Sequence, residues 1–164
     1  MAGMARGRLT NERSQWRKDH PFGFVAKPAV CEDGSVDLLK WLCKVPGKKG
    51  TKWEGGLFPV TLQFTENYPT APPTAYFPQG FFHPNVYPSG KVCLSIINEK
   101  GWRPATTVRT ILLGVQTLLD EPNNADAAQE QAYRVFATNQ KAYIERVKQE
   151  VRKYADNSDD PIVL

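Results

Sequence analysis

Apolar and polar residues alternate most regularly in the segment LFPVTLQF, residues 57–64. Every second side chain there is apolar: Phe58, Val60, Leu62 and Phe64. This period of two is typical of a strand with one buried face. Similar but shorter runs predict three more strands, at residues 22–26, 36–45 and 74–77. The connections between the later runs are short and rich in glycine and proline, which favours a four-stranded antiparallel meander.

A helical pattern precedes these strands. Residues 4–18 place Leu9 and Trp16 two turns apart on one side, as a buried helix face requires. The helix is expected to end at His20, because a residue that precedes a proline is driven out of the helical region.

Three more helices are predicted after the strands. The segment VRTILLGVQTLL, with Thr107 as its N-cap, is apolar around most of its circumference and is therefore expected to be central. Asp126 and Gln129 form the pattern of a capping box, which predicts a helix from there to about Thr138. A last amphipathic helix is predicted over residues 140–155. The elements together predict an α+β fold.

Length and composition indicate one ordinary domain. The chain has 164 residues, of which 41% are apolar and 23% charged. We expect one domain over residues 1–155 and an acidic tail, DNSDDPIVL, over residues 156–164. No apolar run approaches the roughly 18 residues of a membrane span, and the N-terminus lacks the apolar core of a signal peptide. The expected location is therefore the nucleus and cytoplasm, with no membrane partner.

Positive charge is concentrated in the first third of the chain. Residues 1–52 hold 11 Lys or Arg against 5 Asp or Glu, a net charge of +6, whereas the remainder has a net charge of −2. The basic residues are not interleaved with aromatic residues and match no nucleic-acid motif, so we expect no nucleic-acid partner. An acidic protein surface is the alternative partner, and a solvated basic helix face is the structural explanation.

The cysteine pattern argues against a disulfide framework and against a metal. Cys31, Cys43 and Cys93 are odd in number and lie far apart, and the chain has only two histidines. A zinc site would have to collect its ligands from the whole chain, so no metal and no cofactor is expected. Cys43 lies in a predicted strand, which suggests a structural role, and Cys31 lies beside two acidic residues.

Cys93 lies within a long segment, residues 78–106, that is punctuated by prolines and glycines but is too apolar to be disordered. His83 is the nearest histidine, but it stands between two phenylalanines and a proline, which favours a packed scaffold residue over a general base. Transfer of an acyl group from a thioester needs no strong base. It needs an amide donor for the oxyanion and a carboxylate that orients the incoming amine. Asn85 and Asp126 are candidates for these two functions.

Several motifs occur in a fixed order around Cys93: Tyr68-Pro69 with Pro72-Pro73, His83-Pro84-Asn85, Cys93-Leu94 and Trp102-Arg103-Pro104-Ala105. Over about residues 6–155 the chain resembles the ubiquitin-conjugating enzyme family. The segments QWRKDHPFGFVA, PGKKGTKWEGGLF and FHPNVYPSG resemble its SUMO-conjugating branch more specifically. The resemblance implies the ubiquitin-conjugating fold and a transferase that carries a modifier as a thioester.

This resemblance implies roles for four residues. Cys93 accepts the C-terminal glycine of the modifier from an activating enzyme. Asn85 supports the oxyanion or the loop that shapes the site. Asp126 positions the incoming substrate lysine, and Tyr87 lines the channel that this lysine enters.

Other positions are implied to contact partners. Ser89 corresponds to a position that touches a hydrophobic-Lys-x-Glu substrate motif, and Arg13, Arg17 and His20 correspond to a face that binds a second SUMO molecule non-covalently. SUMO ligases are further implied partners. Three substrate-side positions depart from the branch: Thr74 replaces its usual lysine, Lys91 its usual threonine and Ala127 its usual proline.

Two alternative functions remain open from the sequence. The first is conjugation of ubiquitin or another modifier by the same chemistry. The second is a non-catalytic binding module on the same fold, against which the presence of Cys93 argues. The basic N-terminal helix favours SUMO over ubiquitin as the cognate modifier.

Overall fold

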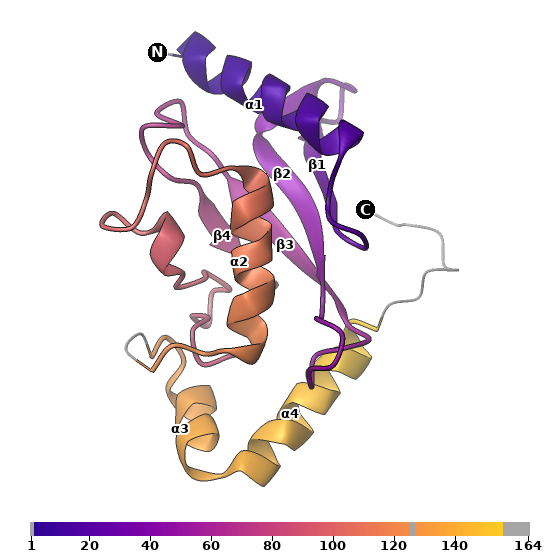
Figure 1. Cartoon of the computed structure of the whole chain (residues 1–164), viewed down its shortest axis with the longest axis vertical. Helices are drawn as coiled ribbons and strands as arrows, with labels where there is room; N and C mark the ends of the chain where they lie inside the picture. The colour runs from indigo at the N-terminus through magenta and orange to yellow at the C-terminus, as the bar shows by residue number, and fades with distance from the viewer. Residues whose placement is uncertain (1, 125–126, 156–164) are drawn as a thin grey trace.

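The computed structural model describes residues 2–124 and 127–155. In chain order, the elements are α1 (Ala2–Lys18), β1 (Val25–Val30), β2 (Val36–Pro46), β3 (Leu57–Gln63), β4 (Thr74–Tyr76), the 3-10 helix η1 (Ser95–Ile97), α2 (Val108–Asp120), α3 (Glu130–Thr138) and α4 (Gln140–Lys153). Figure 1 shows α1 at one end of the molecule, α3 and α4 at the other, and α2 between them in front of the sheet. The predicted α+β architecture is confirmed.

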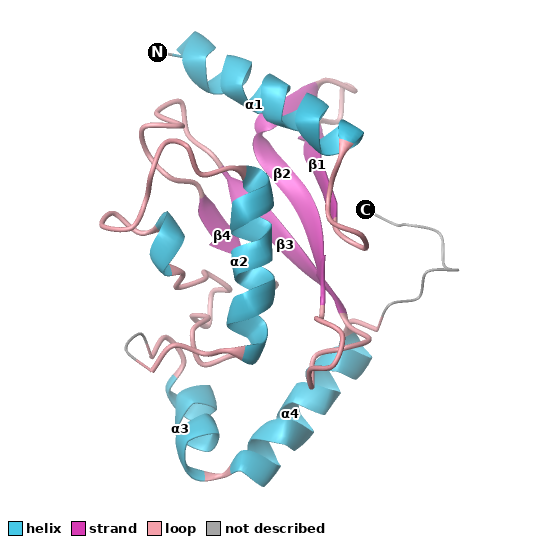
Figure 2. Cartoon of the chain, in the orientation of Figure 1, coloured by secondary structure: helices cyan, strands magenta, loops and turns pink. Residues whose placement is uncertain are grey.

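The four strands form an antiparallel sheet in the order β1-β2-β3-β4 (Figure 2), as the short connections predicted. The first strand, however, begins at Val25 and not at residue 22. The N–H of Phe24 donates to the carbonyl of Pro21 at 3.2 Å, and Gly23 has a φ of +85°, so this segment is a turn. A register shift between Pro28 and Ala29 then places a bulge in β1.

Helix α2 covers one face of the sheet. Six of its apolar side chains are buried: Val108, Ile111, Leu112, Val115, Leu118 and Leu119. The facing strands contribute side chains at every second position, among them Trp41, Cys43, Phe58, Val60 and Leu62. The predicted N-cap is confirmed, because the Thr107 side chain accepts a hydrogen bond from the N–H of Thr110 at 3.2 Å. Burial raises the pKa of the Cys43 thiol above its usual range, consistent with a structural cysteine.

The predicted capping box is wrong in one respect. Helix α3 begins at Glu130, so Gln129 is its N-cap and not its third helical residue. The Gln129 amide instead donates to the carbonyls of Phe81 and Val86, at 2.9 and 3.1 Å, and so serves tertiary structure. Asp126 and the predicted acidic tail, residues 156–164, lie outside the described residues. Within the part of the chain that is described, no helix has the length and hydropathy needed to cross a bilayer.

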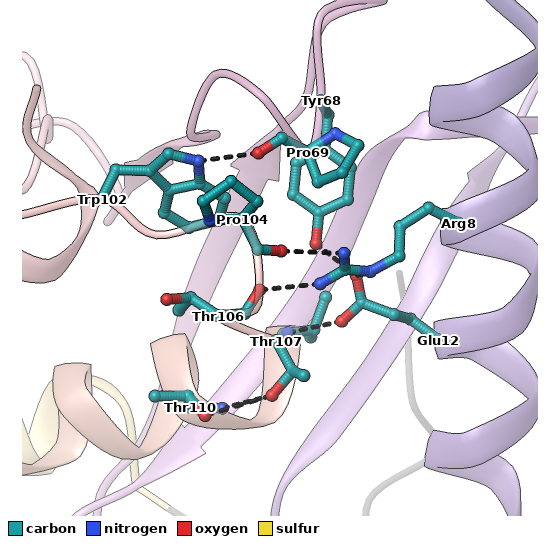
Figure 3. A network of polar contacts seen from close by, with 10 residues as sticks. Arg8, Glu12, Tyr68, Pro69, Trp102, Pro104, Thr106, Thr107 and Thr110 are labelled. Carbon is teal, nitrogen blue, oxygen red and sulfur yellow. Dashed lines mark hydrogen bonds and ion pairs between the residues drawn. The ribbon is translucent and has the colours of Figure 1, made fainter.

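A buried carboxylate joins α1 to the start of α2. Glu12 is only 9% exposed, and it accepts hydrogen bonds from the N–H of Val108, at 2.7 Å, and from the hydroxyl of Tyr68 (Figure 3). Arg8 pairs with the same carboxylate at 3.2 Å and also donates to the carbonyls of Pro104 and Thr106. The negative charge lies at the N-terminus of α2, where the helix dipole favours an anion.

The irregular segment after β4 is held to the other end of α2 by His83. This side chain is fully buried, and its Nε2 lies 2.8 Å from the carbonyl oxygen of Leu118 and 3.2 Å from that of Leu119. Because carbonyl oxygens only accept, Nε2 carries the proton, and Nδ1 accepts the N–H of Asn85 at 3.0 Å. The expectation of a packed scaffold histidine is therefore confirmed.

Burial lowers the pKa of His83 to about 4, although its two carbonyl partners oppose this shift. The folded state thus binds the proton less readily than the unfolded state, so the contribution of His83 to stability is present above pH 6.5 and is lost as the pH falls towards 4. We expect this residue alone to lower the free energy of unfolding by about 2 kcal/mol between about pH 7.5 and pH 5.

Two measurements check this pH dependence. Denaturant unfolding of the native protein and of His83→Gln across the range should show a shallower pH slope for the variant. In an NMR titration, the ring signals of His83 should stay constant down to about pH 5. A His83 midpoint near 6.5 would contradict the buried neutral ring.

Candidate functional site

Cys93 lies on a short hairpin formed by residues 85–93. The N–H of Cys93 donates to the carbonyl of Asn85 at 2.8 Å, and the N–H of Tyr87 donates to the carbonyl of Lys91 at 2.9 Å. The turn closes where the N–H of Gly90 donates to the Tyr87 carbonyl at 2.8 Å. The apparently irregular sequence around the cysteine thus has a defined two-stranded geometry.

Gly90 is required by this turn for two reasons. Its φ is +97°, a conformation that side chains with a Cβ rarely adopt. A Cβ at this position would also lie 2.1 Å from the carbonyl oxygen of Phe77. The close approach allows the N–H of Phe77 to donate to the Gly90 carbonyl at 2.9 Å, which fixes the hairpin beside β4.

The side chains of the hairpin divide between two faces. Val86 and Val92 form a bridge and are both buried in the core. Because side chains alternate along extended backbone, Tyr87, Lys91 and Cys93 point to the opposite face. The thiol is therefore presented on the outer face, while its valine neighbour anchors the backbone.

Strand β4 extends this outer face on one side. Lys91 forms a bridge with Tyr76, and the N–H of Val92 donates to the carbonyl of Ala75 at 2.9 Å. Continuation of the same antiparallel register places Thr74 opposite Cys93.

A groove of about 340 Å³ lies along this surface. One part of its lining comes from Thr74, Tyr87, Lys91 and Cys93, and another part comes from the segment Ile97 to Glu99 after η1. The Cys93 thiol is partly exposed and lies 3.7 Å from the Tyr87 hydroxyl oxygen. The groove thus offers a thiol that a flexible segment of another molecule can reach.

Asn85 is buried beneath this surface and is held by the chain that follows α2. Its Nδ2 donates to the carbonyl of Asn123 at 2.7 Å, and its Oδ1 accepts the N–H of Asn123 at 2.8 Å. These two bonds fix the position of the hairpin relative to the end of α2. Of the two roles implied for Asn85, shaping the loop has a direct structural basis, and stabilising an oxyanion stays a prediction.

The segment before α3 is also tied to the hairpin. The N–H groups of Ala128 and Gln129 both donate to the carbonyl of Pro84, at 2.9 and 3.3 Å. Ala127 precedes these anchors and is exposed. Asp126 is outside the described residues, so its role also stays a prediction.

The predicted substrate-side residues are brought together only in part, because Ser89 and Ala127 are not among the residues that line the groove. Thr74, Tyr87 and Lys91 share the groove with Cys93, and Ser89 is exposed in the turn, where its hydroxyl accepts the N–H of Lys91 at 3.3 Å.

Sequence reasoning missed the supporting contacts of Asn123 and Gln129, and the groove residues Asn98 and Glu99. No local pattern indicates the contacts of Asn123 and Gln129, because their partners lie 38 to 48 residues away along the chain. Asn98 and Glu99 reach the groove only through the folding of the segment after η1.

Arg13, Arg17 and His20 belong to a separate surface on and after α1. Arg17 and His20 are exposed and Arg13 is half-buried. The His20 ring stacks on Trp16 with centroids 5.1 Å apart, and its Nδ1 lies 2.9 Å from the Trp16 carbonyl oxygen. Two residues further on, Phe22 is 100% exposed, an apolar side chain beside basic ones that the sequence did not single out.

The described residues contain no group of three or more His, Cys, Asp or Glu side chains arranged to hold a metal ion. His83 has both ring nitrogens engaged in the core and is not positioned to act as a base for Cys93. The chemistry available to the groove is that of a partly exposed thiol with hydroxyl, amide and ammonium groups around it. Such a site suits transfer of an acyl group that arrives already activated.

Comparison with known proteins identifies the family of this chain. The family model for the ubiquitin-conjugating enzyme matches residues 8–151. SUMO-conjugating enzyme SCE1 of Arabidopsis thaliana is 59% identical over 154 residues, covering 93% of this chain and 96% of the relative. Ubc9 of Dictyostelium discoideum, also named a SUMO-conjugating enzyme, is 51% identical, covering 94% and 98%. SUMO-conjugating enzyme UBC9 of Caenorhabditis elegans is 49% identical, covering 94% of each chain. The chain belongs to the ubiquitin-conjugating enzyme family.

Proposed function

We propose that this chain is a SUMO-conjugating enzyme. An activating enzyme presents the C-terminal glycine of SUMO as a thioester, the Cys93 thiolate attacks its carbonyl carbon, and the activating enzyme leaves as a thiolate. A substrate lysine amine then attacks the Cys93 thioester, forming an isopeptide bond and releasing the thiol. The observation that carries this proposal is the partly exposed Cys93 thiol in its groove, on a chain 49–59% identical along nearly its whole length to enzymes named for this activity.

The second step requires two kinds of assistance. The tetrahedral intermediate needs a hydrogen-bond donor at its oxyanion, and Asn85 supplies it directly or by holding the hairpin. The lysine must be oriented and partly desolvated as a neutral amine, which Tyr87 promotes as a wall of the groove and Asp126 as a carboxylate partner.

The groove also supports a preference for an acidic residue near the substrate lysine. Lys91 lines the same groove as Cys93 and supplies a positive charge there, while Ser89 and Thr74 supply hydroxyl groups close by. A hydrophobic-Lys-x-Glu motif fits this arrangement, with Lys91 as the cation that attracts the glutamate. Ala127 lies exposed at the edge of the segment that is tied to the hairpin.

The basic surface of α1 is the proposed site for a second, non-covalently bound SUMO molecule. Arg13, Arg17 and His20 provide its cationic groups and Phe22 an apolar contact. Among the ion pairs between described residues, none engages Arg13 or Arg17. SUMO ligases remain proposed partners, and location in the nucleus and cytoplasm stays a prediction.

A charging assay tests the proposed function. Incubated with SUMO-activating enzyme, ATP and SUMO, the protein should form an adduct that a reducing thiol removes. Cys93→Ser should form at most a thiol-resistant oxyester, because an ester oxygen replaces the sulfur. Parallel reactions with ubiquitin and its own activating enzyme serve as the control. An adduct with ubiquitin but not with SUMO would overturn the assignment, and no adduct with either would indicate a binding module.

The role of Asp126 is tested after charging. Asp126→Ala should charge normally but discharge to free substrate lysine roughly tenfold or more slowly, because the amine loses its orienting carboxylate. Asp126→Asn keeps the size of the side chain and isolates the effect of the charge. Single-turnover discharge of pre-charged enzyme measures the second step alone. Equal loss in charging and discharge would contradict a role confined to the lysine.

The basic surface of α1 is tested by reversing its charge. Arg13→Glu combined with Arg17→Glu should weaken non-covalent SUMO binding roughly tenfold or more, because attraction becomes repulsion. The matched control is Lys141→Glu with Lys148→Glu on α4, the same charge change at the other end of the molecule. Isothermal titration with SUMO and uncharged enzyme measures both. Binding that survives the α1 reversal unchanged would rule out this surface.

A further inference from the structure

Lys91 has a special position relative to Cys93. The two residues are separated only by Val92, which is buried in the core, so the lysine and cysteine side chains leave the backbone on the same face. Residues two apart in extended backbone have Cα atoms separated by roughly 7 Å. Lys91 is exposed and lines the same groove as the thiol.

The neighbours of Lys91 restrict where its side chain can go. Tyr76 pairs with it from β4, and Tyr87 pairs with it across the hairpin. Directly opposed side chains in antiparallel pairs have Cβ atoms about 5 Å apart, so the two tyrosines flank the lysine on both sides. Side chains in strands lean along the strand direction, which here leads either to Ser89 or to Cys93. The four-carbon stem of lysine can therefore carry the amine over the thiol.

We propose that Lys91 is a self-modification site, which receives SUMO from the Cys93 thioester of the same molecule. The neutral Lys91 amine attacks the carbonyl carbon of the thioester. The carbon–nitrogen bond forms, the carbon–sulfur bond breaks, the sulfur leaves as the Cys93 thiolate, and the proton lost from nitrogen goes to solvent. The products are an isopeptide at Lys91 and a regenerated thiol, and no further reactant is needed. This inference rests on the proposed function, because it requires the charged enzyme.

Proximity makes this reaction competitive when substrate is scarce. A nucleophile held beside an electrophile reacts as if present at a very high concentration, and effective molarities reach about 10⁵ M or more where the geometry is favourable. A substrate lysine at micromolar concentration lacks this advantage unless its motif docks in the groove. Docking would also displace Lys91 or engage its charge, so substrate protects the enzyme.

The modification would limit the activity of the enzyme. An isopeptide at Lys91 removes a positive charge from the groove and leaves a bulky chain beside Cys93, where a substrate must bind. Unmodified Lys91 would thus attract acidic substrates. In the absence of substrate, its modification would block access to Cys93.

The test uses the full-length enzyme with activating enzyme, ATP and SUMO but no substrate. A thiol-resistant adduct should accumulate after the thioester, and mass spectrometry should locate its isopeptide at Lys91. Lys91→Arg, which keeps the positive charge, should lower the rate of this adduct at least tenfold after division by the fraction of charged enzyme. The matched control is Lys100→Arg, an exposed lysine in the loop that follows Glu99, which should form the adduct at the native rate.

A mixing experiment distinguishes transfer within one molecule from transfer between molecules. Tagged Cys93→Ala protein, which has Lys91 but no thiol, is incubated with charged enzyme. We expect no modification of the tagged chain and a rate constant that does not depend on enzyme concentration. Modification of the tagged chain, or an adduct that Lys91→Arg leaves unchanged, would overturn the proposal while the thioester itself still forms. Failure of the thioester to form would instead overturn the proposed function.

Discussion

The geometry of the site depends on a neutral histidine buried at the end of a helix. His83 uses one ring nitrogen to satisfy the last carbonyls of α2 and the other to hold the N–H of Asn85. A charged ring would have two donors and would oppose that N–H group, and burial disfavours the charge as well. His83 thus attaches the hairpin that carries Cys93 to the central helix α2, and it is not positioned to act as a base for the thiol.

Side-chain hydrogen bonds of Asn85 and Gln129 also hold the hairpin in place. Asn85 binds the backbone of Asn123 through both ends of its amide, and Gln129 binds the carbonyls of Phe81 and Val86. Backbone that lacks helix or sheet partners must satisfy its polar groups in some other way when it is buried. Here the side chains of the site segment and its neighbours do so, and the outer face remains available for the thiol, Tyr87 and Lys91.

His83 and Asn85, which support the hairpin, are buried, and the residues that surround the thiol are on its outer face. This arrangement fits the chemistry of a thioester. The acyl group arrives activated, so the site requires access, orientation and a few polar groups more than a strong base. At the opposite end, the buried Glu12 joins α1 to the start of α2 through Val108 (Figure 3). Central helix α2 is therefore bonded to α1 through Glu12 at one end and to the segment that carries the hairpin through His83 at the other.

The sequence by itself predicted most of the elements, although it misplaced the first strand and the capping box, and it singled out Cys93 as the candidate thiol. Period-two alternation in residues 57–64 and the Thr107 cap depend on local preferences, and the structure confirms both. Apolar flanks were also enough to predict that His83 is packed. The tertiary structure alone decided that Gln129 is used in a long-range contact and not a capping box, because two distant carbonyls compete for its amide. It alone placed Lys91 between Tyr76 and Tyr87, because cross-strand neighbours follow from register, which the sequence of one strand does not encode.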